Sequence, residues 1–253
     1  MGVRFLEGYG MYNQVVEAMK MACEDMCRFS GERAKPINAE YLFTIAVAKQ
    51  IDKLNSYYGD PYRIYLEKSR KELSKDCLLP VKFGNPRKRG STIFRDKKPH
   101  IDNKERADIA VYQDITNNNY LGYQPICVIE LKAFNPLRKL VLKDLKRNLE
   151  YFNITGKTGG SVIKSTLFAA LHSSVKIDNE VDESQKILNL KHSYNSWLSE
   201  LGNINHLDVN VTAHSVSKDY QGEVLDEGEY EMLNTETIHH FIGVIVEFRA
   251  REI

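Results

Sequence analysis

The first part of the chain predicts helices, because apolar residues recur there every three or four positions. Residues 12–29 show this spacing in their valines, methionines and cysteines. A second helix is predicted over 38–54: Asn38 is a favourable N-cap, and residues 41–48 are apolar on nearly all sides, which is typical of a buried helix. The pair Asp60-Pro61 combines a cap with a proline suited to the first helical position, so we predict a third helix over 60–75.

Short β-branched and apolar runs replace the helical spacing in the middle of the chain and predict strands. Residues 107–113 and 126–134 form two such runs, and the Asn- and Gly-containing segment between them favours a hairpin with a long loop. The pattern then predicts a helix from Pro136 to about residue 152, a strand over 165–172, a helix over 187–201, and strands over 207–216 and 242–250. This order predicts an α/β fold with a mixed central β-sheet flanked by helices.

Length and composition fit a single globular domain. The 253 residues are enough for one sizeable core, and the apolar fraction of 42% and charged fraction of 27% are ordinary. Apolar stretches fall far short of the roughly 20 residues that a membrane-spanning helix needs. The start of the chain lacks a signal-peptide pattern, and the four cysteines form neither a zinc-ligand spacing nor a disulfide framework. We therefore expect a cytoplasmic protein with no membrane partner.

The net charge of +1 conceals a strong asymmetry along the chain. Residues 1–176 hold 30 Lys and Arg against 19 Asp and Glu, a balance of +11, whereas residues 177–253 hold 5 against 15, a balance of −10. Such segregation favours an anionic partner for the first part, although the two parts can also pair with each other. The acidic stretch 219–236 is expected to be a solvated loop, which leaves open a role in binding a partner.

The strand predicted over 126–134 carries two charged residues in an apolar run. Glu130 and Lys132 are two positions apart, so their side chains share one face, while Ile129 and Leu131 point to the other. Charges in a buried strand are costly unless they are paired or bound to a metal ion. Asp108 on the preceding predicted strand can approach Glu130 across the hairpin, and two carboxylates with a backbone carbonyl suit Mg²⁺ or Mn²⁺.

The spacing of an acid two residues before a lysine is common, so its context decides its meaning. It also occurs at Asp96/Lys98 and Asp102/Lys104, in a charged loop, and at Asp144/Lys146, which we expect on an exposed helix face. Glu130/Lys132 alone lies in an apolar strand that follows an acid-bearing strand. The alternative for this pair is an ion pair within a strand at the edge of the sheet.

These two strands resemble the motif of the PD-(D/E)xK nuclease superfamily, the fold of many restriction enzymes and resolvases. The resemblance rests on the strings Ala107-Asp108-Ile109-Ala110-Val111 and Val128-Ile129-Glu130-Leu131-Lys132-Ala133-Phe134. Ala107 stands where the name of the motif has proline. The order of elements extends the likeness to about residues 36–173. The resemblance implies a restriction-endonuclease-like core within a single domain over 1–253, with an N-terminal helix and a C-terminal extension of helix and strands.

The resemblance also implies roles for individual residues. Asp108 and Glu130 would bind Mg²⁺ or Mn²⁺ together with the carbonyl of Leu131, and Lys132 would position the attacking water. Many members of the superfamily place a glutamate on the helix before the sheet, which makes Glu40 a further candidate metal ligand. A carboxylate at a helix start is also favourable for electrostatic reasons alone, so both interpretations of Glu40 stay open.

Basic residues surround the motif in sequence and predict contacts with a nucleic-acid backbone. They occupy the predicted loop before the motif and the predicted helix after it: Arg87, Lys88, Arg89, Lys97, Lys98, Lys143, Lys146 and Arg147. Lys143 and Arg147 are four positions apart and share a helix face. The alternative is a solvated loop and a solvated helix face.

Taken together, the sequence predicts an Mg²⁺-dependent phosphodiesterase that cleaves DNA, in the first instance an endonuclease. Restriction, phage defence and DNA repair are all compatible with this activity. RNA remains an alternative substrate, although no ordered aromatic platform for RNA is visible, and a homo-oligomer remains open. A function from a different class is a non-catalytic nucleic-acid-binding or scaffold module that keeps the same fold and an ion pair.

Overall fold

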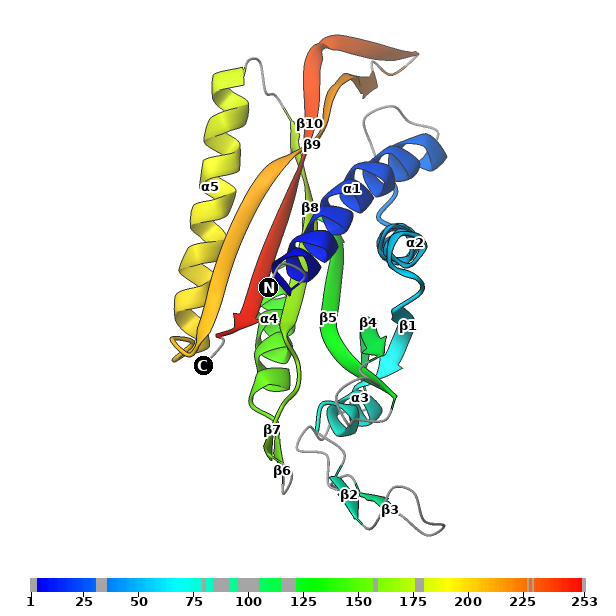
Figure 1. The fold of residues 1–253 in the computed structure, drawn as a ribbon. Helices are drawn as coiled ribbons and strands as arrows, with labels where there is room; N and C mark the ends of the chain where they lie inside the picture. The colour runs from blue at the N-terminus through cyan, green and yellow to red at the C-terminus, as the bar shows by residue number, and fades with distance from the viewer. Residues whose placement is uncertain are drawn as a thin grey trace.

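A six-stranded β-sheet forms the centre of the molecule, with helices on both faces (Figure 1). The computed structural model describes residues 4–30, 36–78, 81–83, 92–94, 105–114, 122–156, 159–175, 180–226, 228 and 230–251. The basic residues predicted in the loop before the motif, Arg87, Lys88, Arg89, Lys97 and Lys98, lie outside these ranges.

The strand order in the large sheet is β1-β4-β5-β8-β10-β9. Its strands are β1 (Tyr62–Ser69), β4 (Arg106–Asp114), β5 (Tyr123–Phe134), β8 (Ser165–Val175), β9 (Leu207–Asp226) and β10 (Glu231–Ala250). β5 and β8 pair in parallel, whereas the other neighbours pair antiparallel. The sheet is therefore mixed, and the predicted α/β class with a mixed sheet flanked by helices is confirmed.

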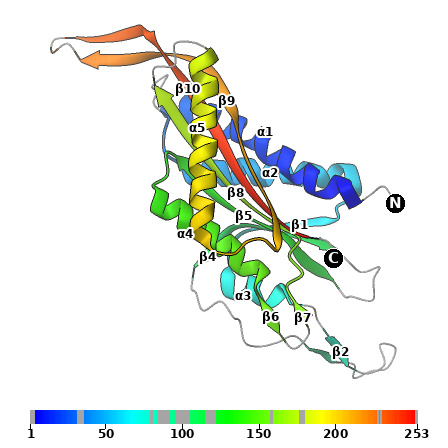
Figure 2. The ribbon, with the colours of Figure 1, turned by 90° about the vertical axis from the view of Figure 1, so that its left-hand side faces the viewer.

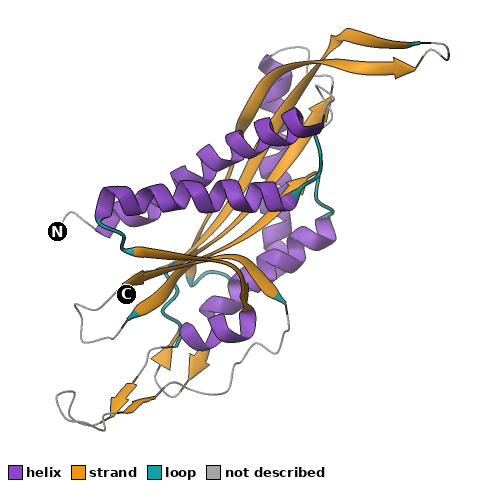
Figure 3. Ribbon diagram, turned by 90° about the vertical axis from the view of Figure 1, so that its right-hand side faces the viewer, coloured by secondary structure: helices purple, strands orange, loops and turns teal. Residues whose placement is uncertain are grey.

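Two helices cover one face of the sheet and the others lie on the opposite face (Figures 1–3). The first pair is α1 (Arg4–Ser30) and α2 (Glu40–Tyr58), which lie side by side over a core that includes Ile129 and Leu131 of β5. The opposite face carries α3 (Arg70–Asp76), α4 (Arg138–Phe152), α5 (Glu180–Leu198) and a short 3-10 turn at Ser199–Leu201. Two small sheets stand apart: β2 (Val81–Phe83) with β3 (Thr92–Phe94), and β6 (Thr155–Gly156) with β7 (Gly159–Gly160).

Most of the predicted elements are confirmed. The two predicted N-terminal helices are α1 and α2, and the predicted hairpin is the antiparallel pair of β4 and β5. The N-cap of α2 is Ala39 rather than the predicted Asn38, and the helix is buried on one side only, because Tyr41 and Ile45 are exposed. The helix after Pro136, the strand near 165–172 and the helix near 187–201 are α4, β8 and α5 with the following turn. These elements were predictable because their apolar spacing reflects the face that each of them buries.

The third predicted helix, over 60–75, is wrong for most of its length. Tyr62–Ser69 is strand β1, and a helix begins only at Arg70. The pair Asp60-Pro61 does not start a helix, because Asp60 has a φ of 56° and forms part of the turn that ends α2. The side chain of Asn55 bonds both backbone groups of Tyr62, and seven residues of β1 then pair with β4. A ladder with a distant strand therefore overrides the local helix signal.

The last two strands are longer than their apolar cores predicted. The acidic stretch over 219–236, predicted to be a solvated loop, lies mostly in β9 and β10, which pair as far as Glu231 opposite Asp226. This ribbon extends beyond the rest of the sheet (Figure 2). The prediction was wrong because acidic residues on a two-stranded ribbon interrupt the apolar alternation that marks a strand buried on one face.

None of the helices in the described ranges has the length and apolar character required to span a membrane. The four cysteines, Cys23, Cys27, Cys77 and Cys127, are buried and free.

The contact between α1 and β10 provides a test of the packing. Gly243 of β10 lies beneath Met19, and an added Cβ would stand 2.6 Å from Met19 Cε and 2.9 Å from Val216 Cγ1. Because valine is stiff at χ1, the Gly243→Ala change must displace the helix or the strand. We expect it to lower the free energy of unfolding by about 1–3 kcal/mol in urea denaturation.

The matched control for this prediction is Gly160→Ala, because an added Cβ at Gly160 meets nothing within 4 Å. It is expected to change stability by less than about 0.5 kcal/mol. Equal stability of the two variants would show that α1 does not approach the sheet as closely as described.

Candidate active site

The hairpin of β4 and β5 sets the two predicted metal-binding acids beside each other. The pairs between these strands run from Asp114 opposite Tyr123 to Ile109 opposite Ile129. One further step in the same register places Asp108 next to Glu130. Side chains alternate along a strand, so both acids lie on the face that carries α3 and α4 rather than on the face of Ile129.

Asp108 is fixed by the backbone of the neighbouring strand. The N–H of Leu131 donates a hydrogen bond to its Oδ2 over 2.7 Å. Burial nevertheless raises the pKa of Asp108 to about 6, because the bond from Leu131 and the positive charge of Lys132 do not fully offset the desolvation. The nearby carboxylates of Glu40 and Asp144 raise this pKa further. Asp108 therefore lies in a site with an excess of negative charge.

Glu130 is the most deeply buried acid of the motif, with only 1% of its surface exposed. Within the described part of the chain its Oε1 has no hydrogen-bond partner. Burial, together with the charges of Asp108 and Asp144, raises the pKa of Glu130 well above its ordinary value. A buried carboxylate oxygen without a partner is costly, and either a proton or a bound cation relieves that cost.

Lys132 connects the strand to the helices on either side. Its Nζ donates to Glu40 Oε1 and Oε2 over 3.1 and 3.2 Å and to the carbonyl of Leu131 over 2.8 Å. Asp144 Oδ2 lies 3.4 Å from the same nitrogen. Burial alone would lower the pKa of Lys132, but the carboxylates of Asp144, Glu40 and Asp108 outweigh it and raise the pKa. The lysine is therefore an ammonium ion at neutral pH.

Glu40 faces the site from the first residue of α2. Its position at the helix start agrees with the electrostatic interpretation, and its two bonds to Lys132 place its carboxylate beside the motif as well. The side chain is 43% exposed, so it contacts both Lys132 and solvent. Glu40 is thus near enough to influence the site through Lys132.

Asp144 of α4 belongs to the site, although it was expected on an exposed helix face. That expectation is wrong, because Asp144 is only 1% exposed and lies between Lys132 and Arg147, whose Nη1 is 2.6 Å from Asp144 Oδ1. The buried position of Asp144 could have been predicted from the helical spacing of its neighbours. Asp144 falls three residues after Val141 and four before Asn148, and both are fully buried.

Lys143 and Arg147 share a face of α4, as their spacing predicted, and both bind one acid. Lys143 Nζ lies 2.6 Å from Glu105 Oε1, and Arg147 Nη2 bonds Glu105 Oε2. Lys146 points away and is exposed. Glu105, which directly precedes β4, had no role in the sequence-based expectation because a single acid before a strand carries no recognisable signal.

The donor atoms fit a hard divalent cation only in part. In the described ranges, no three His, Cys, Asp or Glu side chains are grouped closely enough to hold a metal ion by themselves. The set that suits Mg²⁺ is smaller: the carboxylates of Asp108 and Glu130 and the carbonyl oxygen of Leu131. Water completes the coordination of Mg²⁺ in many protein sites, so two carboxylates are a sufficient protein contribution.

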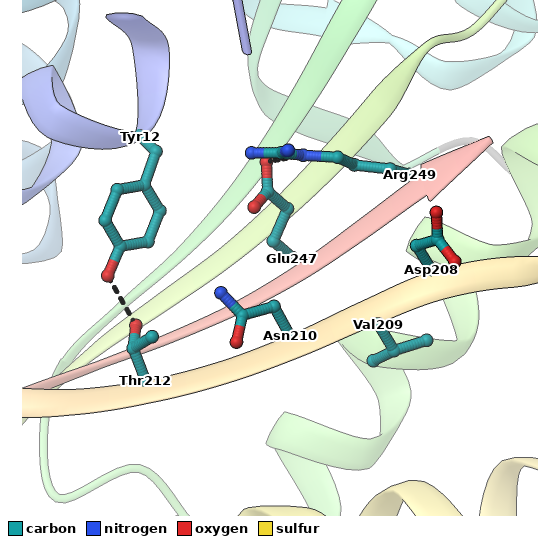
Figure 4. A pocket seen from close by; sticks show the side chains of 7 residues that line it. All are labelled: Tyr12, Asp208, Val209, Asn210, Thr212, Glu247 and Arg249. Carbon is teal, nitrogen blue, oxygen red and sulfur yellow. Dashed lines mark hydrogen bonds and ion pairs between the residues drawn. The ribbon is translucent and has the colours of Figure 1, made fainter. Parts of the chain in front are cut away.

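A pocket elsewhere on the molecule has no part in this arrangement. It lies between α1 and the outer strands and is lined by Tyr12, Asp208, Val209, Asn210, Thr212, Glu247 and Arg249 (Figure 4). Several polar side chains that line the pocket bond one another: Tyr12 Oη is 2.6 Å from Thr212 Oγ1, and Arg249 Nε is 2.7 Å from Glu247 Oε1. It opens on the α1 face, whereas the motif lies on the α4 face.

The raised pKa of Asp108 predicts a pH-dependent penalty on stability. The carboxyl titrates at its ordinary value of 3.8 in the unfolded chain and at about 6 when folded. Between these values the folded state holds a proton that the unfolded state has lost, so stability falls as the pH rises through this window. The variant Asp108→Asn has no charge to desolvate. At pH 7 it should be more stable than the wild type by about 1–3 kcal/mol, and near pH 3.5 the difference should vanish.

Urea denaturation in EDTA at both pH values measures this effect. The control is Asp25→Asn, because the Asp25 side chain is 37% exposed and pairs with Arg28 on the surface of α1. It should change stability by less than about 0.5 kcal/mol at either pH. A less stable Asp108→Asn variant at pH 7 would mean that the bond from Leu131 outweighs the desolvation.

Comparison of this chain with protein-family models, with curated proteins and with solved structures finds no match in any of the three.

Proposed function

We propose that the protein is a metal-dependent nuclease that hydrolyses phosphodiester bonds of DNA. One observation carries the proposal: Asp108, Glu130 and Lys132 lie on two paired strands, near enough to influence one another electrostatically, in a largely buried setting with further carboxylates close by. The mixed sheet with helices on both faces supports the resemblance of these strands to the PD-(D/E)xK superfamily. Glu40 adds support, because the resemblance implies a glutamate facing the site from the helix before the sheet.

The environment of each residue in the candidate site favours a particular role, and two carboxylates with one carbonyl would bind the metal ion. Asp108, Glu130 and the carbonyl of Leu131 would hold Mg²⁺ or Mn²⁺. When bound, the ion would supply Lewis acidity that lowers the pKa of a water and offsets charge on the phosphate. Burial, and after it the neighbouring carboxylates, raises the pKa values of Asp108 and Glu130, and a cation at this place would offset both effects.

Lys132 is better suited to orient a water and to stabilise negative charge than to remove a proton. Its pKa is raised, so its Nζ carries three hydrogens at neutral pH. Glu40 and Asp144 hold that nitrogen from two sides, and the carbonyl of Leu131 accepts from it on a third. To donate to the attacking water or to a phosphate oxygen, the lysine would release one of these three partners, and Glu40, at 43% exposure, is the one that solvent reaches.

A non-catalytic binding or scaffold module of the same fold is the alternative function. It has one specific observation in its favour: every cation described at the site already pairs with a carboxylate of the chain. Glu130 argues against this alternative. Its buried Oε1 has no hydrogen-bond partner within the described ranges, so it does not contribute to a structural ion-pair network. The two experiments below separate the alternatives.

Cleavage should depend on a divalent cation and on Glu130. Supercoiled plasmid should be cut in Mg²⁺ or Mn²⁺ and remain intact in EDTA. The variant Glu130→Gln should lose cleavage by at least about 1,000-fold, because the loss of a ligand charge weakens both metal binding and transition-state stabilisation. Calorimetry should show Mn²⁺ binding to the wild type and none to the variant.

Glu247→Gln is the matched control for Glu130→Gln. Glu247 is also buried in the same sheet, at 3% exposure, but it lies on the α1 face and pairs with Arg249. This variant should cut plasmid at the wild-type rate. Full cleavage in EDTA, or equal loss in both variants, would contradict the proposed mechanism.

Lys132→Ala should separate catalysis from binding. We expect the rate of cleavage to fall by at least about 100-fold while DNA affinity and the unfolding transition change little, because Arg147 still pairs with Asp144. Single-turnover cleavage and fluorescence anisotropy in Ca²⁺ measure the two quantities. Lys191→Ala, which removes an exposed lysine from α5, should leave the rate unchanged. An unfolded Lys132→Ala protein would favour the structural ion-pair interpretation.

A further inference from the structure

One acid, Glu105, pairs with three basic side chains next to the candidate active site. Arg147 Nη2 bonds its Oε2, Lys143 Nζ lies 2.6 Å from its Oε1, and Arg70 Nη1 lies 3.9 Å from its Oε2. The cations come from α3 and α4, which pack on the same face of the sheet as the motif. Both carboxylate oxygens of Glu105 are therefore used by a cluster of three cations.

The two arginines of this cluster are held in place by groups other than Glu105. Arg70 is 1% exposed, and it donates to Tyr151 Oη over 3.0 Å and to Glu150 Oε2 over 2.8 Å. Arg147 is 13% exposed and is fixed by Asp144. If the side chain of Glu105 swings away, the two guanidinium groups stay where they are. The cluster is thus a preformed site for an anionic group with two oxygen atoms.

Glu105 is only partly buried and can leave the cluster. Its side chain is 35% exposed, and that of Lys143 is 51% exposed, so solvent reaches their ion pair. Ion pairs of this exposure contribute little to stability. Arg147 and Arg70 also repel each other, and burial together with this repulsion lowers the pKa of Arg147. An anion between the two guanidinium groups offsets this repulsion, and the carboxylate of Glu105 is not the only anion that can do so.

A phosphodiester group matches the same donors. It presents two anionic oxygens, as a carboxylate does, and guanidinium groups bind both in a bidentate manner. Asp144 contacts both Arg147 and Lys132, so the cluster lies one residue from the lysine of the motif. A phosphate bound here would lie beside the candidate active site, and phosphate contacts of this kind position a nucleic acid on a protein.

We propose that Arg70, Lys143 and Arg147 form a binding site for a backbone phosphate of nucleic acid, and that Glu105 occupies this site until the nucleic acid displaces it. The inference rests on the proposed function for the choice of ligand. It goes beyond that function because it assigns a phosphate subsite and an internal competitor for it.

The test is the affinity of Glu105→Gln for a short fluorescein-labelled DNA duplex, measured by anisotropy in EDTA so that no cleavage occurs. Glutamine keeps the shape of the side chain but removes the competing charge. We expect the variant to bind about two- to fivefold more tightly than the wild type. The control is Glu200→Gln, which releases Arg138 at the start of the same helix from a similar exposed pair. Equal tightening in both variants would show a general charge effect and overturn the proposal.

A second pair of variants tests whether Glu105 acts through the cluster. In a Lys143→Ala/Arg147→Ala background, adding Glu105→Gln should leave the affinity nearly unchanged, because two of the three cations are gone and the third, Arg70, lies 3.9 Å from Glu105. An increase that persists in this background would overturn the proposal. So would the loss of cooperative unfolding in both Glu105→Gln and Glu105→Ala, since Glu105 would then be a structural residue.

This experiment can fail independently of the proposed nuclease activity. Tighter binding by Glu105→Gln in EDTA supports the phosphate site even if the protein does not cut DNA. Cleavage that depends on Glu130, with unchanged affinity in Glu105→Gln, supports the nuclease and overturns the inference.

Discussion

The pairing of β5 with a strand on each of its sides is the interaction on which the rest of the structure depends. On one side β5 pairs antiparallel with β4, which brings Asp108 to Glu130, and on the other it pairs in parallel with β8. A parallel pair needs a crossover, and α4 supplies it. The same crossover carries Asp144 and Arg147 to Lys132. Strand pairing and the assembly of the candidate site are therefore a single event.

The sequence was sufficient to predict the parts of the fold that depend on local spacing. The hairpin with Asp108 and Glu130 could be predicted because a charged pair in an apolar strand is conspicuous and because sequential strands commonly pair. Strand β1 could not be predicted, since Tyr62–Ser69 becomes a strand through a ladder with β4, whose residues come more than thirty positions later. The local sequence at Asp60 favours the start of a helix, but pairing with β4 outweighs this preference.

The candidate site was predicted for the motif but not for its surroundings. Glu130 and Lys132 can be recognised from the sequence because they are charged residues within an apolar strand. The roles of Asp144 and Glu105 depend on contacts with residues that lie far away in the sequence. The periodicity of α4 could have placed Asp144 on the buried face. No pattern in the sequence could have placed Glu105 against Lys143 and Arg147, because this contact depends on how α4 lies across the start of β4.

Electrostatic balance links the site to stability. Lys132, Arg147 and Arg70 each have a carboxylate partner, while Asp108 and Glu130 remain in excess. That excess is unfavourable for folding and favourable for holding a cation, so the two demands oppose each other at these positions. Proteins commonly accept such local instability where a function requires it. The surrounding apolar core, which includes Val128 and Leu131, is what allows the fold to tolerate it.

The packing of α1 on the outer strands has a consequence for synthesis of the chain. Tyr12 of α1 bonds Thr212 of β9, 200 residues further along, and Met19 rests on Gly243 of β10. During translation α1 emerges before these strands and can pack on α2, but the part of its apolar surface that faces β9 and β10 stays uncovered until both strands arrive. Until then the edge of β8 that later pairs with β10 is open, and the sheet around the motif lacks one flank. The candidate site can therefore reach its final structure only after β10 has left the ribosome. Before that point, a nascent chain contains the motif in an incomplete sheet.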